Sequence, residues 1–114
     1  MITGFDLETA PLNEDEKKLV PIIIKGLYTK RSPDQAVHGA RICAAVSEKY
    51  GKLTEPRLRK ITNFLRSAKI LPVIATSKGY YISYDKTEIE KQIKSLEQRQ
   101  EAIQQAIEGL KLWL

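Results

Sequence analysis

The chain has 114 residues, of which 42% are hydrophobic and 29% are charged. That length suits a single domain, and a chain of this size can bury a core without the help of disulfides or a metal. A single cysteine (Cys43) and a single histidine (His38) exclude a disulfide framework and a zinc site with four Cys and His ligands from one chain. The start of the chain shows no signal-peptide pattern, and its longest apolar run, 19–24, is too short to cross a bilayer. We therefore expect a cytoplasmic protein that has no membrane partner.

The positive charge is concentrated in the middle of the chain. The net charge is +5, and residues 25–69 alone carry eleven Lys and Arg against three acids, a net charge of +8. Residues 1–24 carry −3 and residues 85–114 carry −1. A localised basic segment points to an anionic partner such as nucleic acid or membrane phosphate. A solvated basic face is the other explanation, and charge alone does not separate the two.

Two helices are predicted in the first half of the chain. Residues 1–12 look like an extended lead segment. The first helix covers about residues 14–30, because Asn13 is a good N-cap and three acids follow it in the first turn. Pro21 inside this helix predicts a kink or a break. The second helix covers about residues 36–49, with a stop at Gly51. Its apolar face consists of Ile42, Cys43, Val46 and Tyr50.

A third helix is predicted over about residues 55–69, after a short connection. Thr54 is its N-cap, and Pro56 falls in the first turn, where proline is tolerated. Apolar residues recur at helical spacing and predict one buried stripe. That stripe consists of Leu58, Ile61, Leu65 and Ala68.

The pattern then changes to that of a β-hairpin. Residues 71–75 and 80–84 are rich in β-branched and aromatic side chains, and the four residues 76–79 between them end in glycine. Alternation along the second strand places Tyr80, Ile82 and Tyr84 on the inward face. Tyr81 and Ser83 would then point outward.

The last predicted element is a long amphipathic helix from about residue 86 to 113, capped by Asp85. Its apolar residues alternate at spacings of four and three, which is the pattern of a coiled-coil seam. We expect this seam to form a homodimer, although the helix folding back on its own chain is the alternative. The seam consists of Ile89, Ile93, Leu96, Gln100, Ile103, Ile107, Leu110 and Leu114.

Three helices, a hairpin and a final helix follow one another in the order of a winged helix-turn-helix domain. Two stretches, 53–66 (LTEPRLRKITNFLR) and 74–83 (IATSKGYYIS), also resemble small uncharacterised winged-helix proteins of bacteria and their phages. The resemblance covers roughly residues 14–84. It implies a mainly α fold with a small β-hairpin, in which residues 77–81 form the tip and return strand of the wing. We divide the chain into a winged-helix domain with its lead segment (1–84) and a C-terminal dimerisation helix (85–114).

In such domains the third helix lies in the major groove of DNA and the wing touches the backbone. The third helix's polar side is poor in acids and carries side chains suited to base edges and phosphates. Lys78 would contact phosphate at the wing tip, and Arg41 and Lys49 would do so from the second helix. Tyr81 would either pack on a sugar or serve the structure alone. The candidate contacts of the third helix are Pro56, Arg57, Arg59, Lys60, Asn63, Arg66 and Ser67.

No catalytic constellation is visible. Cys43 falls on an apolar face, so we interpret it as a core thiol. We interpret His38 as a surface or capping residue. The acids 14–16 fit a helix start better than a metal cluster, and no phosphate-binding loop is present. We expect no enzyme activity, no cofactor, no metal and no small-molecule ligand.

The leading hypothesis is a dimeric protein that reads double-stranded DNA, as a transcription regulator or a replication accessory. The alternative is a winged-helix module that binds a protein partner through its long helix and has no specific DNA site.

Overall fold

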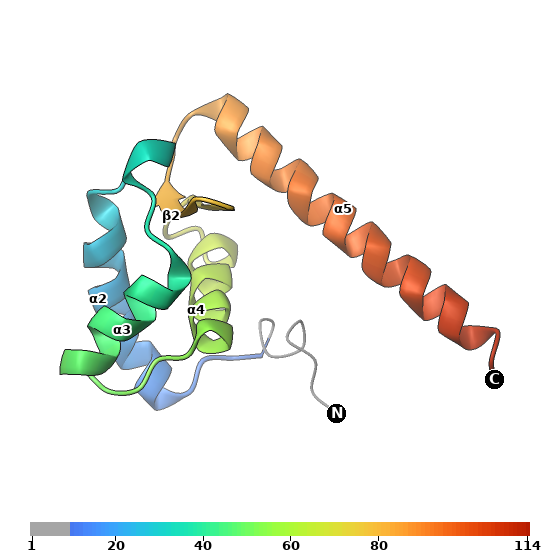
Figure 1. The fold of residues 1–114 in the computed structure, drawn as a ribbon, viewed down its shortest axis with the longest axis horizontal. Coiled ribbons are helices and arrows are strands. Elements are labelled where there is room, and N and C mark those ends of the chain that lie inside the picture. Colours follow the sequence, from blue (N-terminus) through green and yellow to red (C-terminus); the bar gives the residue numbers. More distant parts are fainter. Residues whose placement is uncertain (1–9) are drawn as a thin grey trace. The chain divides into compact units, whose positions relative to one another are not determined.

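The computed structural model describes residues 10–114, which form four α-helices, one short 3-10 helix and a two-stranded antiparallel sheet (Figure 1). The mainly α architecture with a small hairpin is therefore confirmed. The elements in chain order are α2 (Glu14–Tyr28), η1 (Pro33–Gln35), α3 (Gly39–Lys49), α4 (Glu55–Ser67), β1 (Val73–Thr76), β2 (Gly79–Ile82) and α5 (Lys86–Lys111).

The chain divides into two compact units, one ending at Ser83 and the other running from Tyr84 to Leu114. The first unit holds α2, η1, α3, α4 and the hairpin, and the second consists of α5 with its flanking residues. The division falls one residue before the boundary drawn from the sequence.

The start of α2 is fixed by a capping box, as the cap at Asn13 suggested. The Glu16 amide donates to Asn13 Oδ1 at 2.8 Å, and the Asn13 amide donates to Glu16 Oε1 at 2.9 Å. Of the kink or break predicted at Pro21, the break was wrong, because the helix continues to Tyr28. Pro21 lies on the exposed side, where the carbonyl that loses its donor can bond to water.

α4 is the central helix of the first unit. Its residues Leu58, Ile61 and Leu65 are fully buried, which confirms most of the predicted stripe, and both α2 and α3 pack against it (Figure 1). Tyr50 and Ala68 are exposed, so their assignment to the core was wrong. The rest of the core comes from all the neighbouring elements: Leu19, Ile23, Leu27, Cys43, Val46, Leu53, Leu71, Val73 and Ile82.

Both ends of α4 are set by local geometry. The turn from α3 is closed by the Leu53 amide, which donates to Ser47 Oγ at 2.9 Å, and by Gly51 at a φ of 113° that favours glycine. At the other end, Lys69 adopts a φ of 60°, and the Ile70 amide donates to the Leu65 carbonyl at 2.9 Å. This left-handed residue ends the helix at Ser67, two residues earlier than the sequence suggested.

The hairpin pairs Val73 with Ile82 and Thr76 with Gly79. Gly79 has a φ of 119°, and a Cβ added there would lie 2.4 Å from the Val37 carbonyl group, so no other residue fits without a shift. The close approach allows Val37 to form an antiparallel bridge with Tyr80. Because this bridge and η1 occupy residues 33–37, α3 begins at Gly39 and not at residue 36.

The predicted faces of the second strand were partly wrong. Ile82 is fully buried and Tyr80 is more than half buried, as expected, but Tyr81 and Ser83 are also buried. Simple alternation assumes one solvated face, and this hairpin buries side chains on both. Tyr84 is 64% exposed, because it lies beyond the end of β2, where the alternation no longer holds.

α5 begins where Asp85 caps it, with the Thr87 amide donating to Asp85 Oδ1 at 3.3 Å, and it ends at Lys111, two residues before the expected end. Ile89 and Ile103 are partly exposed. The other predicted seam residues are exposed: Ile93, Leu96, Gln100, Ile107, Leu110 and Leu114. No helix within residues 10–114 is long and apolar enough to cross a membrane.

Candidate nucleic-acid interface

The outward side of α4 carries a row of three polar residues spaced four apart. Arg59 and Asn63 are partly exposed, and Ser67 is exposed. Residues four apart lie on one face of a helix, so the row extends along α4 for about 12 Å. Ser67 Oγ donates to the Asn63 carbonyl at 3.0 Å, which fixes the hydroxyl at the end of the row. Pro56, in the first turn, is partly exposed on the same side.

Lys60 does not belong to this surface, and its assignment to an open polar face was wrong. Its residue is only 6% exposed, and its Nζ donates to Glu16 Oε1 at 2.7 Å. The lysine therefore joins α4 to the start of α2. Its charge is held by a buried carboxylate, so an incoming phosphate would have to break that pair.

Arg57 is drawn into the same cluster. Its Nε donates to Glu16 Oε2 at 3.2 Å, and its Nη1 donates to the Lys52 carbonyl at 3.3 Å. One carboxylate thus holds two of the cations that the sequence suggested for DNA. Burial by itself raises the pKa of Glu16, but hydrogen bonds from Lys60, the Asn13 amide and Arg57 outweigh it and hold that pKa below its ordinary value.

Arg66 has a structural contact as well. Its Nε donates to the Val73 carbonyl at 2.9 Å, so the side chain connects α4 to β1. Because this bond fixes the start of the hairpin relative to α4, Arg66 helps to position the turn between β1 and β2.

Phe64 is a surface residue that the sequence analysis overlooked. It is 37% exposed on α4, between Asn63 and the buried Leu65. The signal was available, because Phe64 is the one large apolar residue of this helix that falls off the buried stripe. A phenyl ring beside polar groups can contact a thymine methyl group.

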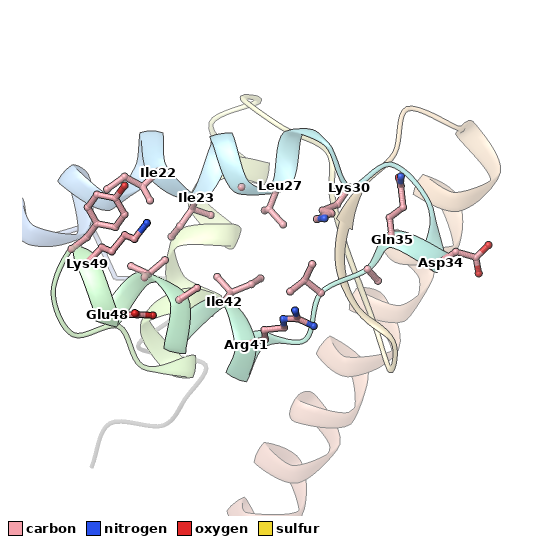
Figure 2. Close-up of a pocket in the computed structure, with 16 residues that line it drawn as sticks. Ile22, Ile23, Leu27, Lys30, Asp34, Gln35, Arg41, Ile42, Glu48 and Lys49 are labelled. Atoms are coloured by element: carbon pink, nitrogen blue, oxygen red, sulfur yellow. The ribbon is translucent and has the colours of Figure 1, made fainter.

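The remaining predicted contacts lie apart from α4. Lys78 is exposed at the turn between β1 and β2, where its amide donates to Thr76 Oγ1 at 3.2 Å. Arg41 and Lys49 are exposed on α3, but they line a groove between α3 and α2 (Figure 2). The structure therefore does not bring these two residues together with the row on α4.

The two residues considered for catalysis, Cys43 and His38, lie in the core and at a helix cap. Cys43 is buried, which confirms the core assignment, and burial together with the charge of Glu55 raises the pKa of its thiol. His38 is the N-cap of α3, and its side chain makes no capping hydrogen bond. Within residues 10–114, no group of three or more His, Cys, Asp or Glu is placed to hold a metal ion.

Comparison of the chain with known protein families, curated proteins and solved structures finds no significant match.

Proposed function

We propose that the protein is a winged-helix protein that binds double-stranded DNA, with α4 in the major groove and the β1–β2 turn on the adjacent backbone. The order of the elements supports this fold. The bridge between Val37 and Tyr80 connects the hairpin to the segment before α3 and so fixes the proposed wing on the helical unit. A short corner joins α3 to α4 and makes the pair a helix-turn-helix.

The observation that carries the proposal is the row of Arg59, Asn63 and Ser67. Arg matches guanine edges and Asn matches adenine edges, while the Ser67 hydroxyl can donate to a phosphate once it releases the Asn63 carbonyl. The row contains no acid, and Glu55, at the first residue of α4, is the only acid on the helix. We add Phe64 to the proposed contacts and remove Lys60 and Arg57, because Glu16 already holds both of them.

Replacing Asn63 with alanine should relax sequence preference more than it lowers overall affinity. A good bidentate base contact is worth roughly 1–3 kcal/mol of discrimination, so preference for adenine at one position should fall by about fivefold or more. Selection of bound oligonucleotides from a random pool, with wild type and variant in parallel, measures this. Lys17→Ala, an exposed change on α2, is the control and should leave the selected sequence unchanged. An unchanged selected sequence for Asn63→Ala would contradict the placement of α4 in the groove.

We further propose that α5 pairs with α5 of a second copy. Within the single chain, six of the eight seam residues are exposed, and an apolar stripe of that length is unusual on a monomer. Gln100 lies in the middle of the seam, where a polar pair can fix the register of two helices at some loss of stability. A dimer would also present two copies of α4 to two half-sites.

Light scattering tests the dimer. The wild type should have a mass of about 26 kDa, twice the 13.0 kDa of one chain, at tens of micromolar. Changing Ile103 and Ile107 to lysine should reduce the mass to that of a monomer, because four charges in a dimer would be buried without partners. Glu101→Lys, on the same helix but off the seam, should keep the dimer. A wild type of 13.0 kDa would remove the two-half-site arrangement.

One observation favours the second candidate, a winged-helix module that binds a protein partner. Arg57 and Lys60 both form ion pairs with Glu16, which leaves α4 with less positive charge for a nucleic acid than its sequence suggests. Retention on heparin separates the two functions. A DNA-binding protein should be retained on heparin and should elute only at high salt. It should also shift random duplex DNA in a gel. A module that binds only protein should do neither.

A further inference from the structure

A groove of about 720 Å³ lies between α2 and α3, on elements that do not include the proposed DNA-contacting row (Figure 2). Both helices pack against α4, and the groove lies between them. Its lining is mixed, with charged and amide side chains toward the ends and apolar side chains from both helices: Ile22, Ile23 and Leu27 come from α2, and Ile42 and Val46 come from α3. Its volume falls within the range of small-molecule sites, which are typically concave and mostly apolar with a few placed polar groups.

Different elements line the two ends of the groove. Residues 34–37, the end of η1 and the link to α3, line one end, and Lys49 and Tyr50 line the other. The α2 residues that line it run from Ile22 to Leu27, about 7.5 Å at the rise of a helix, and Lys30 lies beyond the end of that helix. A space of this size suits a small molecule.

Two cations face the groove at one end, from opposite walls. Lys30 follows the end of α2 and Arg41 lies in the first turn of α3, and Figure 2 shows both at the η1 end of the groove. The carboxylate of Asp34, the nearest acid in that view, points away from the groove. Within the described part of the chain, neither Lys30 nor Arg41 forms an ion pair. At the opposite end Glu48 and Lys49 carry opposite charges, so the positive end is the η1 end.

We propose that this groove binds a small amphipathic anion, with its carboxylate between Lys30 and Arg41 and its aliphatic or aromatic body along the walls of Ile23 and Ile42. The two cations supply the charge that a carboxylate needs, and the apolar walls supply the burial that an aliphatic chain needs. No residue of α4 or of the β1–β2 turn lines the groove, so the groove lies outside the proposed DNA contacts.

Two probes of equal chain length and opposite charge test the site on the full-length protein. In titrations followed by amide chemical shifts, sodium octanoate should shift saturably the signals of residues 22–30 and 41–50. Octylammonium chloride should bind at least about tenfold more weakly, because it brings a like charge to two cations. Equal affinity for the two probes, or shifts that do not cluster on these residues, would overturn the proposal.

Variants of the protein then distinguish binding at this site from nonspecific binding elsewhere on the surface. Lys30→Glu with Arg41→Glu should weaken octanoate binding by about tenfold or more and should strengthen octylammonium binding, because the charge at that end is reversed. Lys25→Glu, an exposed charge reversal on α2 that does not line the groove, should leave both affinities unchanged. Circular dichroism checks that each variant is folded. A Lys25→Glu effect as large as that of the double variant would contradict a defined site.

Discussion

Replacing Glu16 with alanine should lower the free energy of unfolding by about 3–5 kcal/mol, the largest effect expected of any single substitution in the chain. The substitution leaves Lys60 buried at 6% exposure without its 2.7 Å partner, and it also removes the acceptor of Arg57. Breaking one side of a buried ion pair is costly, because the remaining charge stays in a medium that solvates it poorly. One of the two hydrogen bonds of the α2 capping box, from the Asn13 amide to the Glu16 carboxylate, is lost as well.

Urea unfolding measures this change in the free energy of unfolding, and two further variants serve as controls. Glu14→Ala removes an exposed ion pair to Lys17 and should change stability by less than about 1 kcal/mol. Glu16→Met combined with Lys60→Met removes both charges and should recover most of the loss. If Glu16→Ala costs no more than Glu14→Ala, the buried ion pair does not exist in solution.

The same carboxylate makes the stability dependent on pH. Hydrogen bonds from cations and an amide lower the pKa of Glu16 in the folded chain below its ordinary value of 4.5. Its contribution is therefore fully present above that value, and it is lost as the pH falls through the lower, folded pKa. Acid titration of the wild type beside Glu16→Gln isolates this contribution, because the amide does not titrate.

Replacing Leu65 with alanine should cost about 2–5 kcal/mol. Leu65 is 0% exposed and lies where α4 meets the core, so truncation leaves a cavity that the surrounding helices cannot fill. A loss of this size should lower the melting temperature by more than about 8 °C in a domain of this size.

Phe64→Ala is the matched control for Leu65→Ala, because it removes a larger side chain from the next position on α4. Phe64 is 37% exposed, so its truncation should cost less than half as much as that of Leu65. If Leu65→Ala leaves the melting temperature unmoved, α4 is rotated about its axis, and the row of Arg59, Asn63 and Ser67 does not face outward.

Local signals in the sequence predicted much of this structure. The caps at Asn13 and Asp85, the stop at Gly51 and the stripe of Leu58, Ile61 and Leu65 all depend on residues within a turn or two of one another. A helical wheel, however, treats every lysine opposite a stripe as solvated. Lys60 is an exception because its partner, Glu16, lies 44 residues away in the sequence, and no local pattern predicts that contact.

The other errors also come from tertiary context. Tyr81 is buried although simple alternation along the strand assigns it to the solvated face, and Lys69 takes a left-handed conformation that the sequence would assign to glycine or asparagine. The groove between α2 and α3 could not be predicted from the sequence either, because it depends on how two helices pack against a third. Arg41 therefore looked like a residue for phosphate backbone, whereas the fold places it opposite Lys30.

The salt dependence of affinity for a random duplex tests the central claim, that α4 and the hairpin turn contact DNA. Fluorescence anisotropy from 50 to 300 mM salt should give a slope of log K against log salt steeper than about −2, since each phosphate contact contributes about −0.9. Lys78→Ala should flatten the slope by about one unit for each chain in the complex, and Lys17→Ala should not. A slope near zero, or the same slope for Lys78→Ala as for wild type, would contradict the claim.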